Sequence, residues 1–362
     1  MKPIKSFFAF ILVLATLLSL CACVRRVRDS SSVWLDFELN EERTGYEVTG
    51  SNIAGEKPGV IWQMVDVVIP SEYRGKPVVK IGFEAFKDSQ ILASVTIPDT
   101  VEFISGSAFS HCTALTSLHL PKNVKHLGGW SFDGCTSLSE LTVDPANPYF
   151  TSVDNVIYTK DGKELVLYAP AKKQTTFEVP AGVVSINRYS MWHCSALEDI
   201  SIPSTVTDIS YESIMFCDSL RGVDVSENNA VYRSIDGNLY SRDGTTFLRF
   251  YSVAEPTALV LPQSVTTIER FAAFYSDNLT EITIPAGVAY IGDSAFSQCP
   301  DLSKATFENT SGWKLIPTHG KFASPVYLSP SDFESPEKNA TYLTDDYNDH
   351  EWEAVASGFT AP

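Results

Sequence analysis

An aliphatic residue followed by proline recurs at fixed intervals, and this periodicity constrains the fold more than any other feature of the chain. Short and long intervals between these dipeptides alternate. The two dipeptides at positions 97 and 120 therefore have counterparts at 179 and 202 and again at 261 and 284. The long interval is the short interval with an insertion at the same phase. Fixed periods of this size are typical of solenoids, in which each unit buries its apolar side against its neighbours. The dipeptides are Ile97-Pro98, Leu120-Pro121, Val179-Pro180, Ile202-Pro203, Leu261-Pro262 and Ile284-Pro285.

Each short repeat unit is interpreted as one turn of the solenoid. Residues 95–97 alternate apolar and polar side chains, which is typical of a short strand with one buried face. Pro98 ends this strand, because proline donates no hydrogen bond to a sheet. Apolar residues then follow at three-residue spacing, which predicts one or two helical turns on the outer side of the coil. The sequence therefore predicts a β-rich solenoid of short strands and short helical turns over residues 46–307, including an N-terminal cap.

The repeat also has a characteristic wording, seen in "VTIPDTVEFISGSAFSHCTALTS" and "ITIPAGVAYIGDSAFSQCPDLSK". It closely resembles the BspA-like leucine-rich repeats of bacterial surface proteins, over roughly residues 60–307. The resemblance implies a leucine-rich-repeat solenoid that works by surface interaction or adhesion, through a protein or glycan partner, and that carries out no catalysis. Two alternatives stay open: a structural or assembly protein of the cell envelope, and a polysaccharide-binding lipoprotein that feeds uptake.

The two insertions match each other in sequence, the first starting at Leu141 and the second at Val223. Each carries an Asp-Gly pair, Asp161-Gly162 or Asp243-Gly244, between two apolar runs, which predicts a β-hairpin. Both hairpins are rich in aromatic residues, of which Tyr158 and Tyr240 are the candidates for an exposed aromatic surface. Exposed rings would bind sugars or anchor a protein partner, whereas rings packed across the hairpin would hold its strands together.

The N-terminus has the pattern of a bacterial export signal. Two lysines precede an apolar run from Phe7 to Leu20, which is too short to span a membrane as a mature helix. The run ends in Leu20-Cys21-Ala22-Cys23, which resembles a lipobox, and Cys23 fits the lipidated position because small Ala22 precedes it. We therefore predict a signal peptide over residues 1–22 and a lipidated Cys23 with a tether to residue 45. An ordinary secretory signal is the alternative.

Charge and motifs exclude several classes of function. Removing residues 1–22 takes away two lysines and leaves a net charge of −19, which argues against nucleic acid as a partner. The sequence contains none of the short motifs of metalloproteases, P-loop proteins, α/β-hydrolases or EF-hands, so we predict no enzyme, no metal and no cofactor. Five cysteines share one slot of the repeat, which predicts a row of buried free thiols instead of a metal site or disulfides. They are Cys112, Cys135, Cys194, Cys217 and Cys299.

The strand face is the candidate binding surface. The residue just before the aliphatic position of each strand should point outward, and these residues form a polar strip that includes threonine and acidic side chains. Such a strip fits a protein, peptide or glycan, but a solvated sheet face needs no ligand to explain it. The candidate binding residues are Thr96, His119, Glu178, Ser201, Asp224 and Thr283.

Residues 308–362 leave the repeat and carry aromatic and acidic residues. We predict that this segment caps the C-terminal end of the solenoid, because an open solenoid end must be covered. The full prediction is an extracytoplasmic protein, held at the membrane by a lipid, that binds a protein or glycan at the bacterial cell surface.

Overall fold

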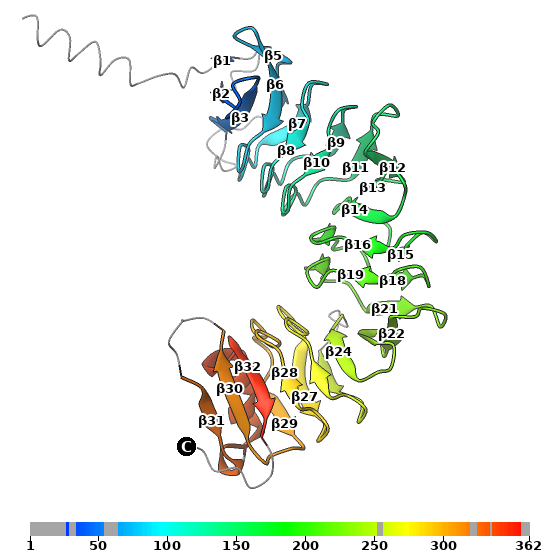
Figure 1. The fold of residues 1–362 in the computed structure, drawn as a ribbon, viewed down its shortest axis with the longest axis vertical. Coiled ribbons are helices and arrows are strands. Elements are labelled where there is room, and N and C mark those ends of the chain that lie inside the picture. Colours follow the sequence, from blue (N-terminus) through cyan, green and yellow to red (C-terminus); the bar gives the residue numbers. More distant parts are fainter. Residues whose placement is uncertain are drawn as a thin grey trace, which may run out of the picture. The chain divides into compact units, whose positions relative to one another are not determined.

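A computed structural model describes residues 27–28, 34–53, 64–251, 256–318, 324–333 and 335–355 (Figure 1). The signal peptide and lipidated Cys23 predicted from the sequence lie outside the described residues. The chain divides into two units, residues 1–114 with 123–132 and residues 115–122 with 133–362. Within the part of the chain that the structure describes, no helix is both long and apolar enough to cross a membrane.

The N-terminal unit is a stack of parallel strands on two sides of its coils. On one side β3, β6, β8 and β10 pair in parallel, and on the other β4 pairs with β7. The antiparallel strand β2 covers the open edge of β3. The strands are β1 (Val27–Arg28), β2 (Trp34–Leu39), β3 (Tyr46–Ser51), β4 (Val65–Val68), β5 (Glu72–Tyr73), β6 (Lys76–Ile81), β7 (Leu92–Thr96), β8 (Phe103–Ile104) and β10 (His126–Leu127).

The tether predicted up to residue 45 is too long. Leu35 and Phe37 of β2 are buried, and Phe37 stacks on Tyr73 with ring centroids 4.4 Å apart. Alternating apolar residues at 35, 37 and 39 are the sequence signal for this strand. Residues 34–39 therefore belong to the folded N-terminal unit and not to a solvated linker.

The first part of the second unit continues the same pattern of parallel strands. We call the side that carries the aliphatic-proline strands the first side and the side that follows it in each coil the second side. Strands β15, β18 and β21 form the first side here, and β14, β16 and β19 form the second. The strands are β9 (Ser117–Leu120), β11 (Glu140–Val143), β12 (Phe150–Val153), β13 (Val156–Thr159), β14 (Glu164–Tyr168), β15 (Thr176–Glu178), β16 (Ser185–Ile186), β17 (Met191–Trp192), β18 (Asp199–Ile202), β19 (Asp208–Ile209), β20 (Ile214–Met215) and β21 (Gly222–Val225).

The last part of the second unit ends in a mixed sheet (Figure 1). Strand β28 of the last second-side ladder pairs antiparallel with β32, which pairs with β30, and β30 pairs with β31. The elements are β22 (Tyr232–Ile235), β23 (Asn238–Ser241), β24 (Thr246–Arg249), β25 (Thr257–Val260), β26 (Thr267–Ile268), β27 (Leu279–Ile284), β28 (Tyr290–Ile291), β29 (Lys304–Phe307), β30 (Trp313–Pro317), β31 (Val326–Leu328), η1 (Pro330–Phe333), α2 (Pro336–Thr341), η2 (Tyr342–Asp346) and β32 (His350–Ala354).

The helical turns predicted on the outer side of each coil are wrong. Residues four apart in this segment, such as Ser107 and His111 or Tyr189 and His193, have φ angles between 54° and 63°. A left-handed residue in every turn prevents a right-handed helix. Alternate backbone N–H groups bond to the next coil, as from Phe86 N to Ala108 O at 2.8 Å, and those between them close turns within the coil, as from Lys87 N to Glu84 O at 3.1 Å. This segment is a third side of the coil, and β17 and β20 form a parallel pair there.

Stacked side chains of the same slot fill the interior of each unit. In the N-terminal unit the rings of Phe86, Phe109 and Phe132 stack with centroids 5.1 and 5.4 Å apart. In the second unit, buried aliphatic residues of the three sides form two apolar clusters, one on each side of the second insertion. The three-residue spacing therefore marks the inward-facing residues of a third side that consists mainly of successive tight turns.

Each insertion is a three-stranded antiparallel meander whose last strand rejoins the coil. Strand β13 pairs with β12 and β14, and β23 pairs with β22 and β24. Strands β14 and β24 then pair in parallel with β16 and β26, so the third strand of the meander serves as the second side of its coil. The parallel ladders of the first and second sides end before the second insertion and restart after it.

A buried asparagine fixes the start of each insertion. Asn229 donates from Nδ2 to the carbonyls of Pro203 and Val206, at 2.9 and 2.8 Å. Its Oδ1 accepts from the backbone N–H groups of Val231 and Tyr232, at 2.9 and 2.8 Å. Asn147, which holds the same position in the first insertion, makes equivalent bonds to Pro121 O and from Tyr149 N and Phe150 N.

We expect Asn229→Ala to lower the free energy of unfolding by on the order of 2–4 kcal/mol, because several buried backbone groups lose their partner. Asn228→Ala is the matched control, since Asn228 is exposed, and it should stay within about 0.5 kcal/mol. Urea unfolding followed by circular dichroism measures both. Equal effects of the two substitutions would contradict the role of Asn229.

Candidate binding surfaces

The predicted outward positions of the first side are solvent-facing. Thr96, His119, Glu178, Ser201 and Asp224 are exposed, whereas Thr283 is half-buried. The flanking residues are buried, as Ile200 and Ile202 are on either side of Ser201. Strand alternation therefore predicts the orientation of five of these six side chains.

The structure brings only three of the six residues together. Glu178, Ser201 and Asp224 stand opposite one another on β15, β18 and β21. We call them the first-side ladder. The other candidates belong to separate sheets: Thr96 pairs in register with Val68, His119 with Thr142, and Thr283 with Val260 and Thr306.

The first-side ladder keeps its hydrogen-bonding groups available. Among the described residues, the side chains of Glu178, Ser201 and Asp224 make no hydrogen bond or ion pair. His119 differs, because its Nδ1 lies 2.9 Å from Thr142 Oγ1. Three exposed polar side chains on adjacent strands are thus free to bind a partner.

The second side of the same coils offers a chemically matched comparison. Glu164, Ser185 and Asp208 stand in register on β14, β16 and β19, and we call them the second-side ladder. These side chains bond locally: Ser185 Oγ donates to Asp208 Oδ2 at 3.0 Å, and Glu164 Oε2 accepts from Asn187 at 3.2 Å. The same residue types are therefore available on one side and engaged on the other.

Ion pairs between successive coils neutralise other charges on the first side. Arg221 lies 2.7 Å from Glu198 and 2.9 Å from Asp199, and the hydrogen bond with Asp199 raises the pKa of Arg221. Lys304 pairs with Glu281 at 3.0 Å, which raises the pKa of Lys304. Such exposed pairs add little stability. They leave the carboxylates of Glu178 and Asp224 as uncompensated negative charges on the first-side ladder.

The exposed aromatic surface proposed for the hairpins does not exist at Tyr158 and Tyr240. Their exposed fractions are 5% and 1%. Burial raises the pKa of Tyr158 to about 12 and also raises the pKa of Tyr240, whose ring contacts Phe247 at 5.2 Å. Both tyrosines face inward because β13 and β23 are the middle strands of their meanders, so their apolar face packs on the coil.

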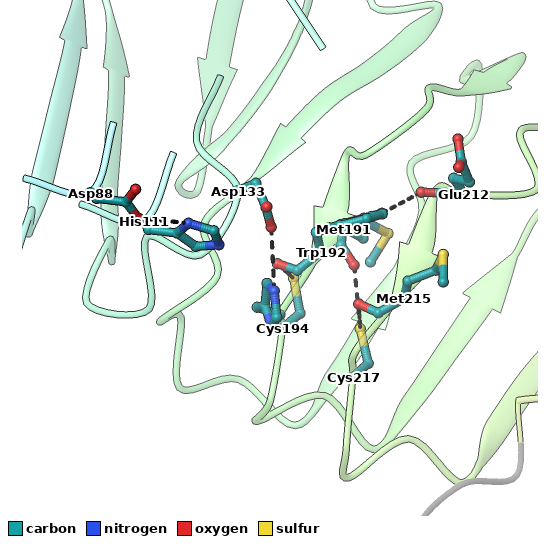
Figure 2. Close-up of polar contacts among 10 residues, drawn as sticks. Asp88, His111, Asp133, Met191, Trp192, Cys194, Glu212, Met215 and Cys217 are labelled. Carbon is teal, nitrogen blue, oxygen red and sulfur yellow. Dashed lines mark hydrogen bonds and ion pairs between the residues drawn. The ribbon is translucent and has the colours of Figure 1, made fainter. Parts of the chain in front are cut away.

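The five cysteines are buried free thiols, as predicted. Each sulfur of Cys112, Cys217 and Cys299 donates to a backbone carbonyl of the preceding coil, as from Cys217 Sγ to Met191 O at 3.3 Å (Figure 2). Burial raises the pKa of Cys112 and Cys299 to about 12, and the pKa of Cys194 is raised by burial and by contact with Cys217. Thiols with such raised pKa values are poor nucleophiles and poor metal ligands.

The histidines that the structure describes do not gather into one cluster. His111 Nδ1 lies 3.1 Å from Asp88, and His193 Nε2 lies 3.3 Å from Asp133, which are two separate pairs (Figure 2). Among the described residues, no three His, Cys, Asp or Glu side chains are placed to hold a metal ion. Asp161 and Asp243 accept hydrogen bonds within their own turns, which lowers the pKa of each.

Two hollows flank Arg249 beside the second insertion, with volumes of about 130 and 470 Å³. The guanidinium is buried and donates to the backbone carbonyls of Phe271 and Phe274, the latter at 3.2 Å. Arg249, on β24, is thus hydrogen-bonded to the third-side turn of the next coil, which contains Phe271 and Phe274. Its two terminal nitrogens are engaged in this contact, which gives it a structural role.

The fold defines a β-solenoid of the leucine-rich-repeat class. A family model described as "BspA type Leucine rich repeat region" matches six copies over residues 64–158, 167–242 and 248–317. The chain belongs to this family, so the resemblance seen in the sequence is confirmed.

Solved structures of bacterial leucine-rich-repeat proteins are similar to this chain. A leucine rich cell surface protein from Faecalibacterium prausnitzii is 25% identical, with 79% of this chain and 77% of that chain covered and a TM-score of 0.44. The pneumococcal vaccine antigen PcpA is 16% identical, with 79% and 71% covered and a TM-score of 0.41. A leucine-rich repeat protein from Eubacterium ventriosum is 16% identical, with 78% and 72% covered and a TM-score of 0.38. No curated protein sequence matches the chain.

Burial and the raised pKa values predict that the five thiols resist iodoacetamide at about pH 8 in the folded protein, because the thiolate is the reactive form. After unfolding without a reductant, all five should be alkylated, as peptide mass spectrometry would show. A disulfide-linked peptide pair, such as Cys194 with Cys217, would overturn the prediction of free thiols.

Proposed function

We propose that this protein is a lipid-anchored binding protein of the bacterial cell surface that recognises a protein partner through the first-side ladder. The observation that carries the proposal is the alignment of Glu178, Ser201 and Asp224, exposed and without partners among the described residues, on three adjacent parallel strands. Parallel strands hold the three side chains in a fixed row. A preorganised row loses little entropy when it binds.

Family membership and sequence support the location. The BspA-like repeats to which this chain belongs are those of bacterial surface proteins. The apolar run after Lys2 and Lys5 and the Ala22-Cys23 junction support export and lipidation. Two or more acyl chains on Cys23 would anchor the protein stably. We include in this proposal residues 1–22 as signal peptide, residues 46–307 as solenoid and residues 308–362 as C-terminal cap.

Binding and not catalysis is the proposed activity. The described cysteines are buried, His111 and His193 stand in separate pairs, and in the first-side ladder the Ser201 hydroxyl makes no hydrogen bond to the carboxylate of Glu178 or Asp224. An enzyme site would need such groups within hydrogen-bonding reach of one another. The alternative of polysaccharide uptake through hairpin aromatics has lost its support, because Tyr158 and Tyr240 are buried.

The test of the binding surface is a triple substitution, Glu178→Ala with Ser201→Ala and Asp224→Ala, in the full-length protein in detergent. We expect at least a tenfold loss in capture of the partner and an unchanged thermal unfolding midpoint, because exposed positions contribute about 0.5 kcal/mol or less each. Capture should also weaken as salt rises, since two carboxylates carry the interaction. Host extracellular matrix and the cell's own envelope serve as parallel sources, and capture from the envelope alone would favour the assembly function.

The matched control removes the second-side ladder by Glu164→Ala, Ser185→Ala and Asp208→Ala. It deletes the same chemistry from the same coils, so partner capture should persist. Loss of capture in this control with retention in the first-side variant would refute the proposed binding surface.

The anchor is tested by Cys23→Ser. We expect the variant to move to the aqueous phase of a detergent partition or to remain an unprocessed precursor, because serine carries no acyl chain in this pathway. A Cys23→Ser protein that is processed and still partitions with membranes would contradict lipidation at Cys23.

A further inference from the structure

The second side of the N-terminal unit carries an exposed aromatic residue in its ladder. Lys80, Phe103 and His126 stand in register on β6, β8 and β10. The Phe103 side chain is 37% exposed although the next residue, Ile104, is fully buried. Together with Ser105 and Gly106, the three residues line an open hollow of about 420 Å³. We call it the aromatic hollow.

One further exposed ring stands beside this hollow, and a second exposed aromatic residue follows in the next coil. Phe83 is 66% exposed, and its ring lies 3.7 Å from the point where a Cβ on Gly106 would stand. Trp130 is 42% exposed and follows Gly129, which holds the slot of Gly106 one coil later. A Cβ on Gly128 would lie 2.3 Å from the backbone nitrogen of Gly106, so the coils approach closely there. The backbone of Gly106, Gly128 and Gly129 therefore forms a surface without side chains, and the Phe83 ring lies at its edge.

The charges around the aromatic hollow are paired. Lys80 lies 2.7 Å from Glu47, and Lys125 lies 2.5 Å from Glu102. Lys125 also sits 4.7 Å from the Phe103 ring centroid, which holds the ring in place. The hollow therefore has no excess positive charge to attract phosphate or sulfate groups. Its lining combines ring surface with the hydroxyl of Ser105 and the ring nitrogens of His126.

In the first part of the second unit, the slots of Lys80, Phe103 and His126 are held by Glu164, Ser185 and Asp208, the second-side ladder. No aromatic residue stands in those three slots. The last ladder of the second unit carries an aromatic residue in the same slot, because Thr246, Thr267 and Tyr290 stand in register on β24, β26 and β28, but there Tyr290 pairs with Glu353 of β32. Serine and threonine occupy this slot at Ser185 and Thr267, so the coil closes without an aromatic ring there, and the exposed part of the Phe103 ring is available to a ligand.

We propose that the aromatic hollow binds an uncharged carbohydrate. Pyranose rings have apolar faces that stack on aromatic side chains and hydroxyl groups that need donors and acceptors nearby, and this lining supplies both. A protein partner would need a continuous surface of about 800 Å² per side, whereas these rings are separated by exposed backbone. The site goes beyond the protein-binding function proposed for the first-side ladder and uses a different side of different coils.

The experiment uses the full-length protein in detergent with cellohexaose, laminarihexaose, maltohexaose and insoluble β-glucan as probes. Tryptophan fluorescence and calorimetry measure the oligosaccharides, and a pull-down measures the polymer. We expect at least one probe to bind, with an affinity that does not change between low and high salt. Binding by none of the four, or binding that collapses as salt rises, overturns the proposal.

Phe103→Ser introduces the residue that the fold already accepts at Ser185, so the variant should fold, and its thermal unfolding midpoint should fall only by the loss of the contacts with Lys125 and His126. This variant should weaken carbohydrate binding at least tenfold, which corresponds to about 1.4 kcal/mol. Trp130→Ala is the second variant and should also weaken binding. Tyr149→Ser is the control, because Tyr149 is 46% exposed but lies on the first insertion. Carbohydrate binding that survives both Phe103→Ser and Trp130→Ala, or that falls equally in the control, refutes the site.

Discussion

Hydrogen bonding from each coil to the next is the interaction on which the whole structure depends. On all three sides, backbone N–H groups find carbonyls on the neighbouring coil, as from Ser105 to Ile81, from Met191 to Ser213 and from Val179 to Ser201. No described coil can pair all of its backbone N–H and carbonyl groups within itself, so none is stable alone. The repeat period is therefore the number of residues in one coil. Residues one period apart occupy equivalent positions in successive coils and stack on one another.

The periodicity predicted this arrangement only in part, and particular residues show why. Strand alternation placed Ile200 inward and Ser201 outward correctly. The prediction of helical turns on the third side was wrong because three-residue spacing fits a run of tight turns as well as a helix. The left-handed residues in these turns, such as Ser107 and His111, are not glycines, so the sequence does not mark them. Burial of Tyr158 depends on which face of its meander meets the coil, and single-sequence periodicity does not record that.

For the binding surfaces, too, the sequence predicts which side chains point outward but not which of them bond to each other. Strand alternation predicts that Glu178, Ser201 and Asp224 point outward. It does not predict which outward side chains bond to each other: Ser185 and Asp208 do so on the second side, whereas the three residues of the first-side ladder do not. The sequence contains an indication of the aromatic hollow. Phe103 and Ile104 are adjacent in a strand, so both cannot face inward, and one of them had to be an exposed apolar residue.

The second insertion interrupts the backbone ladders, and this gives the second unit a mechanical weak point. Strands β19 and β21 end their sheets there, and across the gap a tyrosine hydroxyl replaces a strand: Ile209 N donates to Tyr232 Oη at 3.1 Å. Ring contacts between Tyr211 and Phe271 and between Phe216 and Tyr275 also join the two sides. Within the runs β15–β18–β21 and β25–β27–β29, tension along the stack would have to break rows of parallel backbone hydrogen bonds together. At the insertion it meets mainly side-chain contacts that can yield one at a time, so stretching would open the unit there before it separates the strands within either of these runs.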